Sequence, residues 1–341
     1  MSAVRIGIMG CASIAHRKIL PAIAALPGLE IAAIASRDID KAQAIAATYG
    51  VRAVKGYAAL LDLDEVEAVY IPLPNAMHAL WIECALYARK HVLAEKPLTT
   101  SVSRTSELIG MARSRGLVLR ENVMFLHHSQ HASVKALLDD GAIGELRALH
   151  ATFTVPRRPA DDIRYSAELG GGALMDTGVY PVRAAMSFLD GERGDELDVV
   201  SSVLSRHGRP VDSAGHALLC TGSGVGACLS FGLDHSYRSS YELWGSEGRI
   251  VVEHAYTPPA DHVPVVRLER QSGVQEIRLA PDDQIANALT AFATTVRSGQ
   301  LTDNDSVLRE AVLLDAIRAN ASPHVEHAIE PVNADRQLIS G

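Results

Sequence analysis

The segment Val4-Arg-Ile-Gly-Ile-Met-Gly-Cys-Ala-Ser-Ile-Ala15 is an apolar run that leads into a glycine and a group of small residues. The run Val4–Met9 predicts a buried strand, and Gly10 is typical of a tight turn into a following helix. Gly10, Ala12 and Ala15 stand where a dinucleotide-binding turn carries glycine or another small residue. Because only one of the three is glycine, two interpretations stay open. The turn Gly10-Cys11-Ala12-Ser13-Ile14-Ala15 holds the pyrophosphate of a dinucleotide, or it is an ordinary strand-to-helix turn.

Short apolar runs alternate with helical patterns in the first third of the chain. The predicted strands are Val4–Met9, Leu29–Ala35, Ala68–Ile71, His91–Ala94 and Leu117–Glu121. The predicted helices are Arg17–Ala25, Asp38–Tyr49 (with Asp38 as its N-cap), Met77–Ala88 and Ser101–Arg115. This alternation predicts a doubly wound parallel sheet with helices on both faces, that is, a Rossmann domain of the α/β class.

The pattern changes in the second half, where strands follow one another with short turns. They are predicted at Arg147–Val155, Asp198–Ser205, His216–Cys220, Gly226–Leu233, Tyr241–Trp244 and Arg249–Glu253. Helices are predicted at His127–Asp140 (bridging the two parts), Gly172–Leu189, Asp283–Ser298 and Asn304–Ala321. Consecutive strands favour an open, mainly antiparallel sheet. We therefore expect a Rossmann domain over residues 1–122 and an α+β domain for substrate binding and oligomerisation over residues 123–341.

Composition excludes several classes of function. The 341 residues are 48% hydrophobic and 21% charged, which is typical of a globular protein of two domains. A net charge of −8 without Lys/Arg runs argues against nucleic acid or a membrane as partner. The four cysteines form no Cys-x-x-Cys pair, as expected for free thiols in a reducing compartment. With no leader pattern and no apolar stretch of membrane-spanning length, we expect a cytoplasmic protein.

The end of the second predicted strand indicates which dinucleotide binds. It reads Ala35-Ser36-Arg37, where a site that prefers NAD carries Asp or Glu for the ribose 2′-hydroxyl. A hydroxyl and a guanidinium would instead bind a 2′-phosphate through charge-assisted hydrogen bonds. We therefore predict NADP(H) as the cofactor, the alternative being a solvated arginine.

Two further segments point to a family. They are Pro72-Leu73-Pro74-Asn75-Ala-Met-His78 and Ala94-Glu95-Lys96-Pro97-Leu98. Together with the first turn they resemble the glucose–fructose oxidoreductase/inositol dehydrogenase (Gfo/Idh/MocA) family, and the resemblance extends over essentially the whole chain. It implies that Pro72, Leu73, Asn75, His78 and Glu95 lie at the cofactor, with the nicotinamide between the two segments. It also implies that Lys96 lies at the cofactor and is the catalytic acid/base.

The position of Lys96 supports this role on physical grounds. Ligands bind at the carboxyl ends of strands in such sheets, and Lys96 follows a predicted buried strand. Partial burial beside a cationic nicotinamide is expected to lower the pKa of Lys96 and prepare it for proton transfer. The competing interpretation is a surface lysine at a strand end.

The segment Gly170-Gly-Gly-Ala-Leu-Met-Asp176-Thr-Gly-Val-Tyr180 supplies two further candidates. Asp176 and Tyr180 are four residues apart, so on a helix both project from one face. The family pattern carries Asp at the first place and often His at the second, so Tyr180 argues against an inositol substrate and for a branch of the family that has tyrosine there.

A narrower resemblance, to the TDP-sugar 3-ketoreductases of deoxysugar biosynthesis, rests on four segments. They are the turn from Gly10 to Ala15, Glu121-Asn-Val-Met-Phe-Leu-His-His-Ser-Gln-His131, Asp162-Ile-Arg-Tyr165 and Gly178-Val-Tyr-Pro181. The resemblance implies NADPH-dependent reduction of the C3 ketone of a TDP-linked 2,6-dideoxy-3,4-diketo hexose (dTDP-3,4-didehydro-2,6-dideoxy-glucose 3-reductase type). Lys96 would donate the proton and Tyr180 would assist. Arg164 and Asp176 would contact the cofactor, and Tyr237 and Thr257 the sugar nucleotide.

Other interpretations stay open. The histidines His127, His128 and His131 have helical spacing, but hydride transfer needs no metal and we predict none. Arg157 and Arg158 would face a substrate diphosphate or lie in a solvated turn.

A dehydrogenase of free aldoses or trans-dihydrodiols is the alternative enzyme, and a non-catalytic NADP(H) sensor or scaffold is the alternative of another class. By analogy with the family we expect a homodimer or homotetramer.

Overall fold

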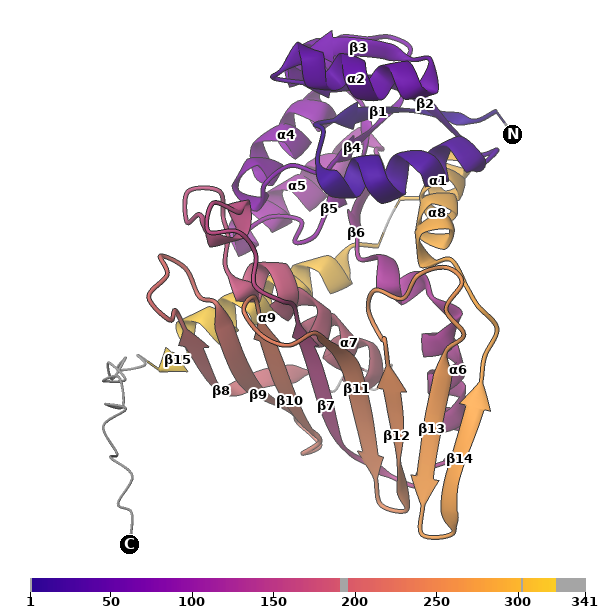
Figure 1. Ribbon diagram of the computed structural model, residues 1–341, viewed down its shortest axis with the longest axis vertical. Helices are drawn as coiled ribbons and strands as arrows, with labels where there is room; N and C mark the ends of the chain where they lie inside the picture. The colour runs from indigo at the N-terminus through magenta and orange to yellow at the C-terminus, as the bar shows by residue number, and fades with distance from the viewer. Residues whose placement is uncertain (1, 191–195, 302, 323–341) are drawn as a thin grey trace, which may run out of the picture.

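The computed structural model describes residues 2–190, 196–301 and 303–322, which form two adjoining domains (Figure 1). The N-terminal domain is built on a sheet of six parallel strands in the order β3-β2-β1-β4-β5-β6. The strands are β1 (Val4–Met9), β2 (Leu29–Ser36), β3 (Arg52–Lys55), β4 (Ala68–Ile71), β5 (His91–Glu95) and β6 (Leu119–Asn122). The chain order reverses at β1, which pairs with both β2 and β4. The predicted Rossmann topology is confirmed.

Helices cover both faces of this sheet. They are η1 (Ala15–Ile19), α1 (Leu20–Ala25), α2 (Ile39–Tyr49), α3 (Tyr57–Leu61), α4 (Asn75–Tyr87) and α5 (Val102–Arg115). The predicted cap of α2 is present, because the Asp38 carboxylate accepts hydrogen bonds from the backbone amides of Asp40 and Lys41. The predicted helix Arg17–Ala25 instead begins at Ala15 with a π-helical turn. The prediction omitted β3 and α3, which are only four and five residues long.

The C-terminal domain is built on a nine-stranded sheet in the order β14-β13-β12-β11-β7-β10-β9-β8-β15. Its strands are β7 (Leu146–Thr154), β8 (Leu197–Ser205), β9 (Ala214–Thr221), β10 (Gly226–Gly232), β11 (Arg238–Gly245), β12 (Gly248–Glu253), β13 (Val265–Arg270), β14 (Gly273–Arg278) and β15 (Ala321–Ser322). Two pairs, β10 with β7 and β15 with β8, are parallel and the others are antiparallel. The predicted mainly antiparallel sheet is confirmed.

Helices lie against one face of this second sheet and leave the other open (Figure 1). They are α6 (Ser129–Asp139, after a short turn η2 at Met124–His127), η4 (Leu174–Gly178), α7 (Val179–Leu189) and α9 (Asp305–Ala319), and a further short turn η3 spans Ile163–Tyr165. The largest hydrophobic core lies between this helical layer and the sheet, with Phe231, Tyr241 and Tyr256 among its fully buried side chains.

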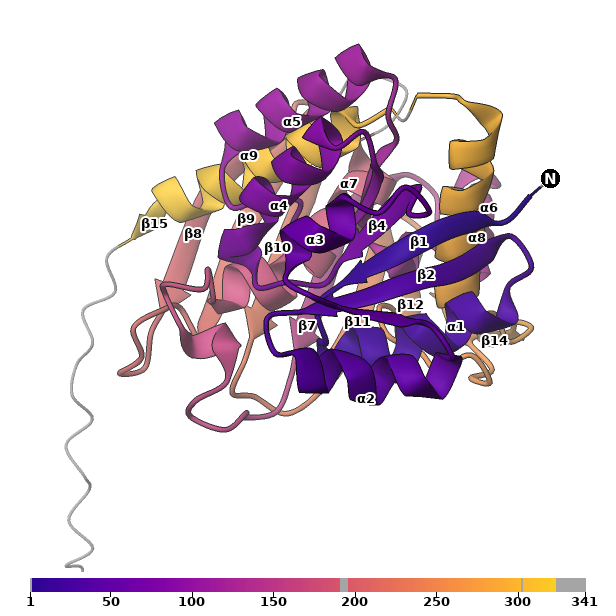
Figure 2. The same ribbon diagram turned by 90° about the horizontal axis from the view of Figure 1, so that it is seen from above.

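The two last helices return to the N-terminal domain. Helix α8 (Gln284–Ser298) contacts β1 and α1, and α9 contacts α5 (Figure 2). The Leu289 and Phe292 side chains of α8 complete the apolar cluster on that face of the parallel sheet. The two domains are therefore joined by helix packing at two places, where α8 contacts β1 and α1 and where α9 contacts α5. Among the described residues, no helix is long and apolar enough to cross a bilayer.

Candidate active site

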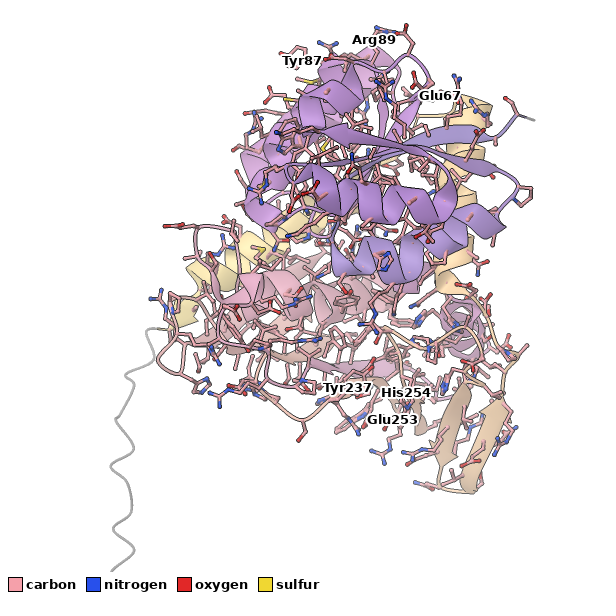
Figure 3. All side chains as sticks on the ribbon, turned by 45° about the horizontal axis from the view of Figure 1, so that its top comes forward. Glu67, Tyr87, Arg89, Tyr237, Glu253 and His254 are labelled. Carbon is pink, nitrogen blue, oxygen red and sulfur yellow. The ribbon has the colours of Figure 1, made fainter. Side chains whose placement is uncertain are left out.

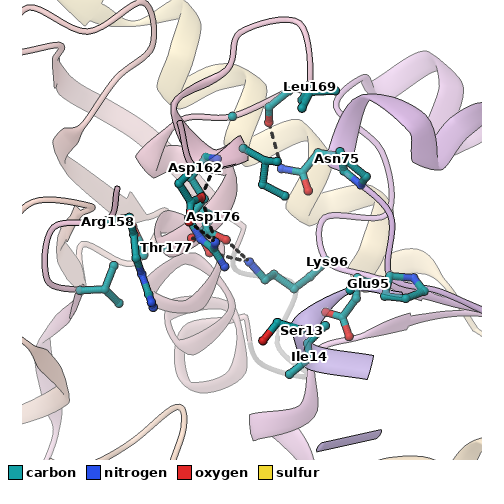
Figure 4. A pocket seen from close by; sticks show the side chains of 18 of the residues that line it. Ser13, Ile14, Asn75, Glu95, Lys96, Arg158, Asp162, Leu169, Asp176 and Thr177 are labelled. Atoms are coloured by element: carbon teal, nitrogen blue, oxygen red, sulfur yellow. Dashed lines mark hydrogen bonds and ion pairs between the residues drawn. The ribbon is translucent and has the colours of Figure 1, made fainter. Parts of the chain in front are cut away.

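A cavity of about 740 Å³ lies between the carboxyl edge of the parallel sheet and the second domain (Figure 4). Thirteen of the predicted site residues line it: Ala12, Ser13, Ile14, Pro72, Leu73, Asn75, Glu95, Lys96, Arg164, Asp176, Tyr180, Tyr237 and Thr257. Strands β1, β4 and β5, which end here, are neighbours at the point where the strand order reverses. Ligands bind at this point in sheets of this kind, because the loops after adjacent strands diverge there.

The turn after β1 needs glycine at its first position. Gly10 has φ +114°, a conformation that side chains rarely adopt, and a Cβ there would lie 3.0 Å from Leu73 Cδ2. Ala12, Ser13 and Ile14 then bring the chain along the cavity. The turn thus leaves its backbone exposed to a ligand at the start of the first helix, where anions are favoured.

Not all predicted cofactor residues line the cavity. Gly10, Cys11, Ala15, Ser36, Arg37 and His78 are absent from its lining. His78 is fully buried, and its ring nitrogens lie 2.8 Å from the carbonyl oxygens of Leu73 and Pro97. His78 therefore connects the loops that follow β4 and β5, and it does so from a buried position outside the cavity lining.

Ser36 and Arg37 lie at the end of β2. The Ser36 side chain is buried and accepts a hydrogen bond from the Asp38 amide, 3.2 Å away. The carboxylate of Asp38 caps α2 and is thereby occupied. Arg37 is exposed and lies beside the Tyr57 hydroxyl; burial raises the pKa of this phenol while Arg37 lowers it. The first carboxylate after the strand is thus engaged in hydrogen bonds at the start of α2.

Lys96 is the first of a series of charged side chains in the cavity that are connected by hydrogen bonds (Figure 4). Its Nζ donates to the backbone oxygen of Asp176 at 2.6 Å and to Asp176 Oδ1 at 3.0 Å. Asp176 Oδ2 accepts from Arg164 Nε at 2.7 Å, and Arg164 Nη1 lies 3.1 Å from Asp162 Oδ1. Lys96 comes from the N-terminal domain and the other three from the C-terminal domain. The ammonium group is therefore held at the domain junction.

Electrostatics keep this lysine charged. Burial alone would lower the pKa of Lys96, but the negative charge of Asp176, with smaller effects of Tyr180 and Glu95, raises it above its usual value. Burial likewise opposes ionisation of Asp176, yet Lys96 and Arg164 lower its pKa to about 2. The expected lowering of the Lys96 pKa is therefore wrong for the protein without ligand, because that inference left out the carboxylate. A protonated Lys96 is an acid ready to donate.

The glycine-rich segment before Asp176 sets the position of Arg164. A Cβ on Gly171 would lie 2.3 Å from the Arg164 carbonyl oxygen, so only glycine permits this approach. The amide of Gly172 donates to the same oxygen at 2.9 Å. The close packing places the guanidinium of Arg164 beside Asp176, which follows at the start of the helical segment.

Tyr180 faces the cavity from the same helical segment as Asp176, as their spacing predicts. Its ring centroid is 5.2 Å from Lys96 Nζ and packs against Phe153 at 4.6 Å and Tyr256 at 5.6 Å. Burial raises the pKa of the Tyr180 hydroxyl, with Glu95 and Asp176 adding to the effect and Lys96 opposing it. Tyr180 is therefore a neutral hydrogen-bond donor next to the ammonium group.

Glu95 and Asn75 complete the N-terminal side of the cavity. Glu95 Oε1 accepts from the Tyr70 hydroxyl at 2.7 Å and from Asn122 Nδ2 at 2.8 Å, which fixes the carboxylate beside Lys96. Asn75 Nδ2 donates to the Gly170 carbonyl at 3.0 Å and ties the loop after β4 to the second domain.

Tyr237 and Thr257 lie at the far end of the cavity, in the C-terminal domain. Their hydroxyl groups share a hydrogen bond of 2.9 Å, although they are 20 residues apart in sequence. Figure 3 shows Tyr237 on this domain, distant from Glu67, Tyr87 and Arg89 at the opposite end of the molecule. The two hydroxyl groups form a polar pair that the C-terminal domain contributes to the cavity lining.

The structure adds lining residues that the sequence did not single out as site residues. They include Lys18, Met124, Phe153, Arg158, Asp162 and Thr177. Asp162 and Thr177 lie within two of the segments singled out in the sequence, and Arg158 belongs to an arginine pair for which two interpretations were open. Met124 belongs to the segment Glu121–His131 that carries the resemblance, whereas Lys18 carried no signal, because nothing in its local pattern distinguishes it from other surface positions.

The histidine cluster has a structural role. His131 lies 2.9 Å from the Tyr241 hydroxyl and 3.1 Å from the Ala255 carbonyl, and burial lowers its pKa to about 3. His128 caps α6 by accepting from the Gln130 amide. Within residues 2–190, 196–301 and 303–322, no group of three or more His, Cys, Asp or Glu is placed to hold a metal ion.

The arrangement can donate a proton to an oxygen held near Lys96 Nζ, with Tyr180 within reach of the same region. No amino-acid side chain supplies a hydride, so a redox reaction here needs a cofactor at the edge of the parallel sheet. The open turn after Gly10 and the cavity beside it provide the place for one.

Comparisons with known proteins agree with this geometry. The model described as an oxidoreductase family with NAD-binding Rossmann fold matches residues 4–123, and that of the GFO/IDH/MocA C-terminal domain matches residues 131–251. A dTDP-3,4-didehydro-2,6-dideoxy-alpha-D-glucose 3-reductase of Streptomyces violaceoruber is 52% identical over 94% of this chain and 96% of its own length. One from Actinomadura kijaniata is 49% identical, covering 93% of this chain and 96% of its own. The crystal structure of KijD10, a 3-ketoreductase from Actinomadura kijaniata in complex with NADP and TDP-benzene, has a TM-score of 0.91 at 49% identity, covering 94% of this chain and 98% of that one.

Proposed function

Because this chain belongs to the Gfo/Idh/MocA family of oxidoreductases, we propose that it is an NADPH-dependent ketoreductase of sugar nucleotides. Its substrate is a TDP-linked 2,6-dideoxy-3,4-diketo hexose, and the product is the C3 alcohol. The observation that carries the proposal is the charged Lys96, held by Asp176 in a cavity at the carboxyl edge of the dinucleotide-binding sheet. The relatives that resemble the chain over nearly its whole length support the same substrate class.

The residues at the sheet edge fit an NADPH cofactor. Gly10 leaves the backbone of the first turn open to a pyrophosphate, and the end of β2 offers the Ser36 hydroxyl and the exposed Arg37 guanidinium to a 2′-phosphate. Pro72, Leu73 and Glu95 line the cavity and would contact the nicotinamide. When bound there, NADPH supplies the hydride that the protein itself lacks.

The protein's part in the reaction is to supply and position a proton. Lys96 protonates the alkoxide that develops at C3, and Tyr180 hydrogen-bonds to the same oxygen. A cation beside this oxygen stabilises charge that appears only in the transition state, which is where stabilisation accelerates a reaction. Asp176 keeps Lys96 protonated before the reaction by raising its pKa. Tyr237 and Thr257 contact the nucleotide part of the substrate.

Replacing Ser36 by Asp and Arg37 by Ile together should reverse the cofactor preference. A carboxylate repels the 2′-phosphate of NADPH and accepts a hydrogen bond from the 2′-hydroxyl of NADH. Loss of charge-assisted bonds should lower the ratio of kcat/KM for NADPH over NADH by at least about tenfold. The measurement is steady-state kinetics with each cofactor, and Arg113→Ile on the exposed face of α5 is the control. A wild type that already prefers NADH would refute the assignment of Ser36 and Arg37.

The substrate class is tested by comparing the TDP-sugar with the corresponding free sugar under NADPH consumption. The nucleotide contributes binding energy away from the reacting carbon, so its removal should reduce kcat/KM by more than about tenfold. Equal efficiency on both would refute the sugar-nucleotide assignment in favour of an aldose or dihydrodiol dehydrogenase. Binding of NADPH without turnover of any of these compounds would instead indicate a sensor.

The open face of the C-terminal sheet supports self-association. Val200, Val203, Leu218 and Trp244, all on its strands, are exposed large apolar side chains. Apolar surface of this kind on one face of a sheet favours contact with another protein surface. We infer that the chain forms a homodimer or homotetramer through this face, which sedimentation velocity would show.

A further inference from the structure

The loop that follows β7 carries two adjacent arginines in different environments. Arg157 is turned outward, and its Nε lies 3.3 Å from Asp234 Oδ2 in an ion pair. Arg158 lines the cavity, on the opposite side of it from Ser13 and Ile14 (Figure 4). Arg157 is therefore already ion-paired, whereas Arg158 faces the cavity in which a ligand would bind.

Contacts behind the loop hold Arg158 in this orientation. Its backbone amide donates to the Tyr165 hydroxyl at 3.3 Å, and this hydroxyl donates to the Leu233 carbonyl at 3.1 Å. The guanidinium of Arg209 lies 3.6 Å from the Tyr165 ring centroid and pairs with Asp234, the partner of Arg157. With the backbone fixed in this way, binding of a ligand by the Arg158 side chain does not have to order the loop as well.

The side chains that line the cavity include equal numbers of basic and acidic groups, and half of these groups are ion-paired with one another. The basic side chains of the lining are Lys18, Lys96, Arg158 and Arg164, and the acidic ones are Glu95, Asp161, Asp162 and Asp176. Lys96 and Arg164 are bound to Asp176 and Asp162. Within the described part of the chain, no ion pair involves Arg158 or Lys18, and among the acidic lining residues Glu95 and Asp161 likewise have none. The cavity thus keeps two cations available to a multiply charged anion.

The two available cations come from different domains. Lys18 lies on η1, just after the turn that faces the cofactor, and Arg158 lies at the end of the cavity that holds Tyr237. Thr154, the last residue of β7, pairs with Arg238, the first residue of β11. The segment that leads from Thr154 to Arg158 therefore begins beside Tyr237, which immediately precedes Arg238. Arg158 is therefore the available cation on the nucleotide side.

We propose that Arg158 binds the diphosphate of the sugar nucleotide and thereby selects nucleotide-linked sugars over free ones. This inference rests on the proposed function. A guanidinium matches phosphate oxygens with two parallel N–H groups, which an ammonium does not, so the selection depends on arginine in particular. Tyr237 and Thr257 bind beyond it, and Lys96 meets the sugar at the other end.

The test measures the affinity of TDP, TMP and thymidine in the presence of NADP by titration calorimetry, for the wild type and three variants. Arg158→Ala should weaken TDP binding by roughly 10- to 100-fold and leave thymidine unchanged, because only the diphosphate loses a charge-assisted contact. Arg158→Lys should recover part of the affinity. Arg157→Ala is the matched control and should bind all three ligands as the wild type does.

The outcomes separate the two proposals. If the wild type binds TDP tightly and Arg158→Ala binds it equally well, the role of Arg158 is wrong and the proposed function is unaffected. If Arg158→Ala weakens thymidine or NADPH as much as TDP, Arg158 acts on the shape of the cavity or on the cofactor, and the inference also fails. If the wild type shows no affinity for TDP and no turnover of the TDP-sugar, the proposed function itself is refuted. Melting temperatures of all variants establish that each is folded.

Discussion

Replacing Lys96 by Met should lower kcat for the proposed reduction by about two to four orders of magnitude, which is typical of a lost general acid. Methionine has similar length and no proton to donate, so the alkoxide must take its proton from water. The fold should persist, because Asp176 keeps its 2.7 Å bond to Arg164 when Lys96 is gone. NADPH binding should persist as well, since the turn after β1 and the end of β2 are untouched.

Steady-state kinetics with the TDP-sugar measure the effect, and fluorescence titration measures NADPH affinity in the same variant. Lys90→Met is the control, because Lys90 donates to the Leu63 carbonyl on the far side of the sheet and does not line the cavity. A Lys96→Met enzyme with near-normal kcat would remove Lys96 from the mechanism. Loss of NADPH binding together with kcat would show that the lysine serves the cofactor and not the proton.

When kcat of the wild type is measured against pH, deprotonation of Lys96 should cause no loss of activity on the acidic side of the profile. The raised pKa of Lys96 keeps the ammonium form through neutral pH, so the proton to be donated is present there and is lost only at alkaline pH.

Local patterns predicted the elements that carry the chemistry, because each has a strong signal. The strand before Gly10, the strand that ends at Glu95 and the helical spacing of Asp176 and Tyr180 were all read from apolar periodicity or from spacing. Elements with weaker signals were missed. The hairpin β13–β14 alternates apolar residues with Arg267, Glu269 and Glu276 at the sheet edge, and this resembles a polar loop as much as a strand.

The pKa of Lys96 shows what a linear sequence leaves out. Asp176 is 80 residues away along the chain, and its contact with Lys96 depends on how the two domains meet. The position of Lys96 after a buried strand predicts burial, which lowers a lysine pKa, but it does not reveal the carboxylate whose charge outweighs burial. The role of His78 was hidden for the same reason, since its two carbonyl partners lie in two different loops.

The domain junction contains a further long-range arrangement that the sequence did not reveal. Arg183 of α7 lies between two buried carboxylates, Glu121 of β6 and Glu310 of α9. Its Nη2 is 2.7 Å from Glu121 Oε2, and Glu121 Oε1 accepts from the Leu98 amide at 2.6 Å. Leu98 is two residues after Lys96, so the cluster connects both domains to the loop that carries the proton donor.

Arg183→Met should lower the free energy of unfolding by about 3–5 kcal/mol, because it leaves two buried carboxylates without a counter-charge. Arg309→Met on α9 is the matched control. Arg309 pairs with Asp190 and Glu196 but is about one-third exposed, so its loss should cost less than about 1 kcal/mol. Denaturant unfolding of both variants and the wild type measures the difference.

The penalty for Arg183→Met should also depend on pH. Burial raises the pKa of Glu310 in the folded protein, and Arg183 opposes this rise. Without the arginine, the folded pKa of Glu310 lies still further above the unfolded value of about 4.5. A group with a raised folded pKa loses its contribution to stability as the pH rises above the unfolded value, so the variant should be closer to the wild type near pH 5 than near pH 8. A penalty of less than about 1 kcal/mol at both pH values would mean that water reaches the two carboxylates and that the Arg183 cluster contributes little to the domain junction.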